Sequence, residues 1–142
     1  AADMESVRYE YDVDGENFAS AGRASESVKR TLKQLGVSPE SVRRVAIAMY
    51  EGEINMVIHA HGGKAVVDLF PAHVEIRLID RGPGIADIEL AMKAGYSTAP
   101  ESIRSLGFGA GMGLPNMKKY SDEMTIDSQV GVGTSVYLRI NF

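Results

Sequence analysis

The stretch from Met49 to Gly63, MYEGEINMVIHAHGG, constrains the fold more than any other part of the sequence. Glu51, Asn55 and His59 stand four residues apart, and an α-helix of about 3.6 residues per turn places such residues on one face. The positions around them are mostly apolar, so this helix should be largely buried. A buried carboxylate or amide is costly without a partner. The helix alone favours a hydrogen-bonded structural pair over the alternative, a carboxylate that handles a proton beside a side-chain oxygen that holds Mg²⁺.

Length and composition restrict the class of protein. A chain of 142 residues is long enough for one domain with a proper core, which we place at residues 1–142. The formal net charge of −4 argues against a general nucleic-acid binder, because no stripe of Lys and Arg is present to neutralise phosphates. No apolar run approaches the ~20 residues that span a bilayer and no signal peptide is present, so we expect a cytoplasmic protein without a membrane partner. Cysteine is absent, which excludes disulfides and thiolate metal sites.

The first half of the chain has the pattern of one strand followed by two helices. Apolar and charged residues alternate in Glu5–Val13, as in a half-buried strand. The apolar spacing then becomes helical over Phe18–Leu35. Ser38 and Pro39 supply an N-cap and a first helical residue for the second helix, the one described above, and we expect it to end at the glycine pair Gly62-Gly63.

The second half of the chain has mostly strand-like patterns. We expect strands at Lys64–Phe70, His73–Asp80, Glu123–Ser128 and Thr134–Phe142, and short helices at Asp87–Lys93 and Pro115–Tyr120. The first two of these strands flank a Pro-Ala turn, which indicates an antiparallel hairpin. The order of elements predicts an α+β fold: a mixed, mainly antiparallel sheet with helices on one face.

A glycine-rich run, GFGAGMGL at Gly107–Leu114, needs an explanation. Four glycines at alternate positions cost backbone entropy, and they are kept where the backbone must approach something closely or adopt a positive φ. The run directly precedes a predicted helix, whose free N–H groups favour an anion. It is not a Walker A loop, because no Gly-Lys-Ser/Thr follows, and it lacks the third glycine of a dinucleotide-binding fingerprint. A phosphate cradle and a flexible surface loop remain equally good interpretations of the run alone.

Two further glycine motifs follow predicted strands. Asp80-x-Gly82-x-Gly84 is either an ordinary strand end with a turn, or a carboxylate that accepts from an exocyclic amine beside glycines that let a flat ring approach. Gly131-x-Gly133, between two strands, is most simply a hairpin. Neither motif is specific by itself.

Taken in order, the four pieces resemble the N, G1, G2 and G3 boxes of the GHKL ATP-binding superfamily, which includes gyrase, Hsp90, histidine kinases and MutL. The pieces are Glu51-x-x-x-Asn55, Asp80-x-Gly82-x-Gly84, Gly107–Leu114 and Gly131-x-Gly133-Thr134. The resemblance covers about the C-terminal two-thirds of the chain. It implies the two-layer α/β sandwich of that superfamily (the Bergerat fold), which fits the order of elements above.

The resemblance also implies roles for individual residues. Glu51 would be the general base that orients or deprotonates the attacking group, and Asn55 would coordinate Mg²⁺. Asp80 would accept from the adenine amino group, with Thr134 in the same hydrogen-bond network. The glycines would contact the nucleotide through their backbone: Gly82 and Gly84 at the adenine, and Gly107, Gly109, Gly111 and Gly113 around the phosphates. The segment 94–106 would be a short lid over ATP.

Within the superfamily, the sequence is most similar to the stand-alone anti-sigma factor serine/threonine kinases. That similarity implies ATP and Mg²⁺ as cofactors, and a sigma factor and an anti-anti-sigma (antagonist) protein as partners. The reaction would be phosphorylation of a serine on the antagonist. The resemblance also implies a homodimer, for which Val7, Tyr9 and Tyr11 of the first strand either form an exposed edge or simply pack inside.

One position departs from the family pattern. The family places an arginine that reaches the ATP phosphates in the first helix, where this chain has Ser20, with Arg23 one turn further on. This departure favours one alternative, a nucleotide-gated binding module without phosphotransfer; a detached ATP-binding domain of a sensor histidine kinase is another. His59 and His61 do not indicate a zinc site, because residues two apart on a helix point to different faces.

Overall fold

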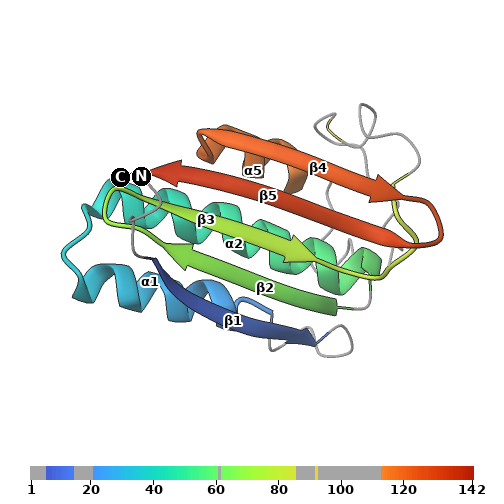
Figure 1. Cartoon of the computed structure of the whole chain (residues 1–142), viewed down its shortest axis with the longest axis horizontal. Coiled ribbons are helices and arrows are strands. Elements are labelled where there is room, and N and C mark those ends of the chain that lie inside the picture. The colour runs from blue at the N-terminus through green and yellow to red at the C-terminus, as the bar shows by residue number, and fades with distance from the viewer. Residues whose placement is uncertain (1–5, 15–20, 61, 86–91, 93–112) are drawn as a thin grey trace, which may run out of the picture.

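Five strands form one antiparallel sheet in the computed structural model, which describes residues 6–14, 21–60, 62–85, 92 and 113–142. The strands are β1 (Val7–Asp14), β2 (Gly62–Leu69), β3 (His73–Ile79), β4 (Glu123–Gln129) and β5 (Gly133–Asn141), in the spatial order β1-β2-β3-β5-β4. Each pair of neighbouring strands is antiparallel. The helices of the described ranges, α1 (Arg23–Gln34), α2 (Pro39–Ala60) and α5 (Gly113–Tyr120), cover one face of the sheet (Figure 1). The predicted α+β fold with helices on one face is confirmed.

The start of α2 follows the predicted capping pattern. The Ser41 backbone N–H donates to Ser38 Oγ at 3.3 Å, and Pro39 occupies the first helical position. At its other end α2 stops at Ala60, two residues before the predicted end at the glycine pair. Gly62 and Gly63 instead begin β2, where they pair with β1, and both have positive φ angles. The strand therefore starts two residues earlier than predicted, because glycines have no side chain and so cannot contribute to the alternation of apolar and polar residues that marks a strand.

The start of α1 differs from the prediction and depends on a residue of α2. The helix begins at Arg23 after a turn at Ala21–Gly22, so the predicted start at Phe18 is wrong. No side chain of α1 itself caps its first turn. The Glu53 carboxylate, only 2% exposed, accepts from the backbone N–H groups of Gly22, Ala24 and Ser25 at 2.9, 3.3 and 2.6 Å. A carboxylate at a helix N-terminus satisfies free donors and complements the helix dipole, which fastens α1 to α2.

The core lies between the sheet and the three helices. Its buried side chains include Val45 and Met49 of α2, Ile76 of β3 and Leu138 of β5. Gly52 lets α2 approach the sheet closely, because a Cβ at this position would collide with the Leu78 side chain and lie 3.2 Å from Met117 Cε. The helix with the candidate catalytic face is thus held directly against the middle of the sheet.

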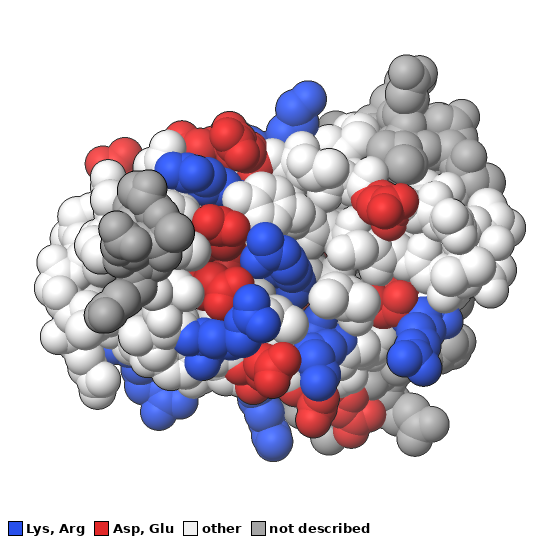
Figure 2. Space-filling view, in the orientation of Figure 1, with Lys and Arg blue, Asp and Glu red and all other residues white. Residues whose placement is uncertain are grey.

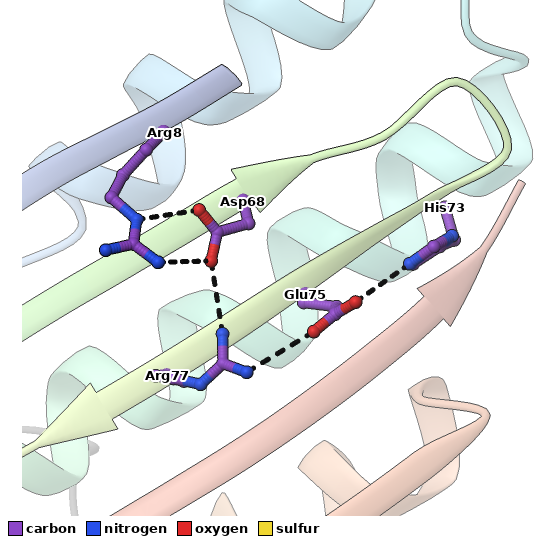
Figure 3. A network of polar contacts seen from close by, with 5 residues as sticks. All are labelled: Arg8, Asp68, His73, Glu75 and Arg77. Carbon is purple, nitrogen blue, oxygen red and sulfur yellow. Dashed lines mark hydrogen bonds and ion pairs between the residues drawn. The ribbon is translucent and has the colours of Figure 1, made fainter. Parts of the chain in front are cut away.

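The opposite face of the sheet carries charged side chains of both signs (Figure 2). Asp68 of β2 accepts from Arg8 of β1 at 2.8 and 3.1 Å, and from Arg77 of β3 at 3.1 Å. Arg77 also donates to Glu75 at 3.4 Å, and Glu75 bonds the His73 ring at 3.0 Å (Figure 3). These contacts connect β1, β2 and β3 across the face that the described helices leave open.

Two carboxyl groups of this network have lowered pKa values. Hydrogen bonds and charge from Arg8, together with the charge of Arg77, outweigh burial and hold the pKa of Asp68 below its ordinary value. Burial alone would raise the pKa of Glu75, but hydrogen bonds from His73 and Tyr137 and the charge of Arg77 lower it overall. Because these groups bind protons less readily in the folded state, they stabilise the fold above their unfolded pKa values, and this contribution is lost as pH falls through the folded ones.

We therefore expect the free energy of unfolding to decline on acidification below about pH 4, near the ordinary pKa values of Asp and Glu. Asp68→Asn should lower stability at pH 7 and make the decline towards acid shallower. Urea unfolding at pH 7 and pH 3 measures both effects. Asp127→Asn, a change of the same chemistry at an exposed position of β4, is the matched control. An equal acid dependence of Asp68→Asn and the wild type would contradict the assignment.

Candidate functional site

The predicted catalytic face of α2 meets the beginning of α5. The Asn116 side-chain amide of α5 donates to Glu51 Oε1 at 3.4 Å. The Asn55 amide nitrogen contacts Met117 Sδ at 3.9 Å. A Cβ on Gly113 would lie 2.8 Å from both polar atoms of the Asn55 amide. A side chain at position 113 would therefore displace the Asn55 amide, and the structure brings Glu51, Asn55 and Gly113 together.

The Asn55 side chain suits an oxygen-ligated cation. Its nitrogen faces a sulfur atom, while its Oδ1 receives no hydrogen bond from the described residues. In the described ranges there is no group of three His, Cys, Asp or Glu side chains that could hold a metal by themselves. This donor set fits Mg²⁺, which commonly binds through one or two protein oxygens plus substrate phosphates and waters. The beginning of α5 beside Asn55 adds free backbone N–H groups suited to an anion.

Asp80 lies just beyond β3 and is fixed by backbone donors. Its Oδ1 accepts from Gly82 N–H at 2.9 Å and from Thr134 N–H at 3.1 Å, and its own N–H donates to the Thr134 carbonyl at 2.9 Å. The structure thus connects the two residues that the resemblance placed in one network. Because both side-chain bonds engage Oδ1, no described residue donates to Oδ2. That oxygen is available to accept from an exocyclic amine.

Ser128 of β4 belongs to the same network but was not predicted. Its Oγ lies 2.8 Å from Thr134 Oγ1 and accepts from Ile85 N–H at 2.7 Å. The hydroxyl thereby fixes the chain that follows Asp80 to the β4–β5 hairpin. Sequence reasoning had no signal for this residue, because a single serine near a strand end is common.

Glycines allow the segments around Asp80 to pack backbone against backbone. Gly84 has a φ of 79° and lies against the Gln129 carbonyl, and Gly133 has a φ of 146° and lies against the Asp80 carbonyl. Gly63, also unpredicted, has no space for a Cβ between Ile79 and Met56, and its Cβ would lie 3.0 Å from Asp80 Cα. Because Met56 follows Asn55 on α2, this contact places the Asp80 network at the same end of the molecule as the catalytic face.

Several predicted residues fall outside the described ranges. These are Gly107, Gly109 and Gly111, the lid segment 94–106, and Ser20. Apart from Met92, the short helix predicted at 87–93 also falls there. Arg23, the alternative to the family arginine, is the exposed first residue of α1. The side chains of Tyr9 and Tyr11 pack against the core, whereas Val7, at the edge of the sheet, is 55% exposed.

Comparison with known proteins gives a consistent result. A family model described as histidine kinase-like ATPase domain matches residues 16–140. The anti-sigma F factor of Thermoanaerobacter sp. is 33% identical over 130 residues, which cover 84% of this chain and 87% of that protein. The anti-sigma F factor of Clostridium acetobutylicum is 30% identical over 124 residues, covering 84% and 83%. Within the described ranges, no helix is long and apolar enough to cross a membrane.

Proposed function

Because this chain belongs to the family of histidine kinase-like ATPase domains, we propose that it is an ATP-dependent protein serine kinase and acts as an anti-sigma regulatory factor. The main structural support for kinase activity is that Glu51 and Asn55 of α2 both contact the beginning of α5. The similarity to anti-sigma F factors supports a sigma factor as the protein held. The resemblance of the motifs adds an antagonist protein as the one phosphorylated. A homodimer is part of the same proposal.

The described residues suggest how the nucleotide would be held. Asp80 Oδ2 would accept from the adenine amino group, and the resemblance assigns the lining of the adenine pocket to Gly82, which donates to Asp80 Oδ1, and Gly84, which packs against the Gln129 carbonyl. Asn55 Oδ1 is the protein oxygen for Mg²⁺, which when bound supplies positive charge against the phosphates. Gly113 of the glycine run stands at the beginning of α5, and the resemblance assigns it, with Gly107, Gly109 and Gly111 outside the described ranges, to backbone contacts with the phosphates.

Phosphoryl transfer then needs one base and correct positioning. The Glu51 carboxylate takes the proton of a serine hydroxyl as the serine oxygen forms its bond to the γ-phosphorus. The bond from that phosphorus to the bridging oxygen breaks, and its electron pair leaves with ADP. Asn116 holds the Glu51 carboxylate by a hydrogen bond at 3.4 Å, so that the base keeps its orientation towards the reacting atoms.

The first experiment incubates the protein with γ-labelled ATP, Mg²⁺ and purified candidate antagonist proteins from the same genome. We expect label on a partner serine, stable to acid and absent without Mg²⁺. Acid-labile label would instead indicate transfer to histidine, as in a detached sensor kinase domain.

The second candidate function is a nucleotide-gated binding module without phosphotransfer. The feature that favours it is Ser20 at the position of the family arginine. Tight ATP binding with no label on any partner would support this module and contradict the kinase.

A further inference from the structure

A groove runs between α1 and α2, and of its lining residues only Glu51 belongs to the site described above. Its volume is about 260 Å³. The α2 wall includes Ala46, Ile47 and Tyr50 and ends at Glu51, and α1 contributes Glu26 and Lys29. The groove thus joins an apolar wall to the candidate base.

The size and lining of the groove argue against a nucleotide as its occupant. Pockets for drug-sized ligands have volumes of ~300–1,000 Å³, and this one is smaller. No glycine is among its lining residues, and two of its three charged side chains are carboxylates, which disfavour phosphates. The groove suits a few amino-acid side chains.

The Glu51 side chain faces both helices that flank α2. α2 lies between α1 and α5 (Figure 1). Glu51 lines the groove shared with α1, and its Oε1 accepts from Asn116 of α5. A hydroxyl that enters along the groove therefore reaches the carboxylate from the α1 side. Asn55, proposed to hold Mg²⁺, and Gly113, proposed to contact the phosphates, meet at the beginning of α5.

We propose that this groove seats the serine-bearing segment of the protein substrate and delivers its hydroxyl to Glu51. The inference rests on the proposed kinase function. A small or apolar side chain beside the serine lies against Ile47 and the Tyr50 ring. Glu26 and Glu51 outnumber Lys29, so the groove favours a segment with a basic residue near the serine.

The test measures KM and kcat for the labelled antagonist protein, together with ATP affinity. Ile47→Arg places a bulky cation on the apolar wall, and we expect about a tenfold increase in KM for the protein substrate, with kcat and ATP affinity unchanged. Leu35→Arg is the matched control, because Leu35 is 62% exposed at the end of α1 and outside the groove. This control should keep the wild-type KM.

A second pair of variants tests the charge argument without touching the apolar wall. Glu26→Lys and Glu40→Lys both reverse an exposed acid in the first turn of a helix, but only Glu26 lines the groove. Only Glu26→Lys should raise KM. Phosphotransfer with a wild-type KM in both groove variants would overturn the groove assignment alone. A wild-type protein that transfers no phosphate to any antagonist would overturn the proposed function, and the groove assignment with it.

Discussion

Glu51→Gln is expected to slow phosphoryl transfer by about 10²–10⁴-fold, the usual contribution of a positioned general base. Glutamine keeps the shape of the side chain and can still accept from Asn116, so the helix packing should be unchanged. It cannot take up the serine proton. Single-turnover transfer of labelled phosphate measures the rate, and titration with a fluorescent ATP analogue should give the wild-type affinity.

The matched control for this variant is Glu40→Gln, because Glu40 is an exposed acid in the first turn of the same helix. It should transfer phosphate at the wild-type rate. Wild-type transfer by Glu51→Gln would show that Glu51 is not the base.

The second large effect is expected at Gly133. With a φ of 146°, this glycine lies against the Asp80 carbonyl, and a Cβ would also be 2.9 Å from Arg81 Cα. Backbone atoms cannot swing away as the end of a side chain can, so Gly133→Ala must displace the chain around Asp80. We expect ATP affinity to fall by about tenfold or more, which corresponds to ~1.4 kcal/mol or more, and the melting temperature to fall as well.

Gly131→Ala separates backbone strain from this collision. Gly131 has a φ of 80° and no neighbour within 4 Å of an added Cβ, so alanine there experiences only the strain of positive φ, about 1–3 kcal/mol. Its stability should fall while ATP affinity stays near that of the wild type. Isothermal titration with ATP and thermal melts distinguish the two variants. Equal losses of affinity would mean that the contact with Asp80 has no special role.

Local patterns predicted most of the fold. Alternation of apolar residues placed the strands, and the Ser38-Pro39 cap placed the start of α2. The errors fall where local pattern carries no information: the start of α1 depends on Glu53, thirty residues further along the chain. A signal for Glu53 was nevertheless present, because a second carboxylate within the apolar run of α2 requires a partner once that helix is buried.

The residues proposed for the site come from sequence motifs, whereas the contacts that support them had no sequence signal. Asp80 and Thr134 meet as the resemblance implied, and Asn55 lies against Gly113. Ser128 and Gly63 became visible only through contacts between distant segments. Such residues have ordinary local sequence, so only the assembled fold identifies them.

Glu51 and Glu53 lie two positions apart on α2 and have different roles. Glu53 is enclosed and satisfies the first turn of α1, whereas Glu51 faces the region where chemistry is proposed. The two positions should therefore be conserved for different reasons: position 51 for catalysis and position 53 for the fold. In a descendant that has lost phosphate transfer, selection for a base at position 51 would end, whereas the acceptor at position 53 would still be needed by the first turn of α1.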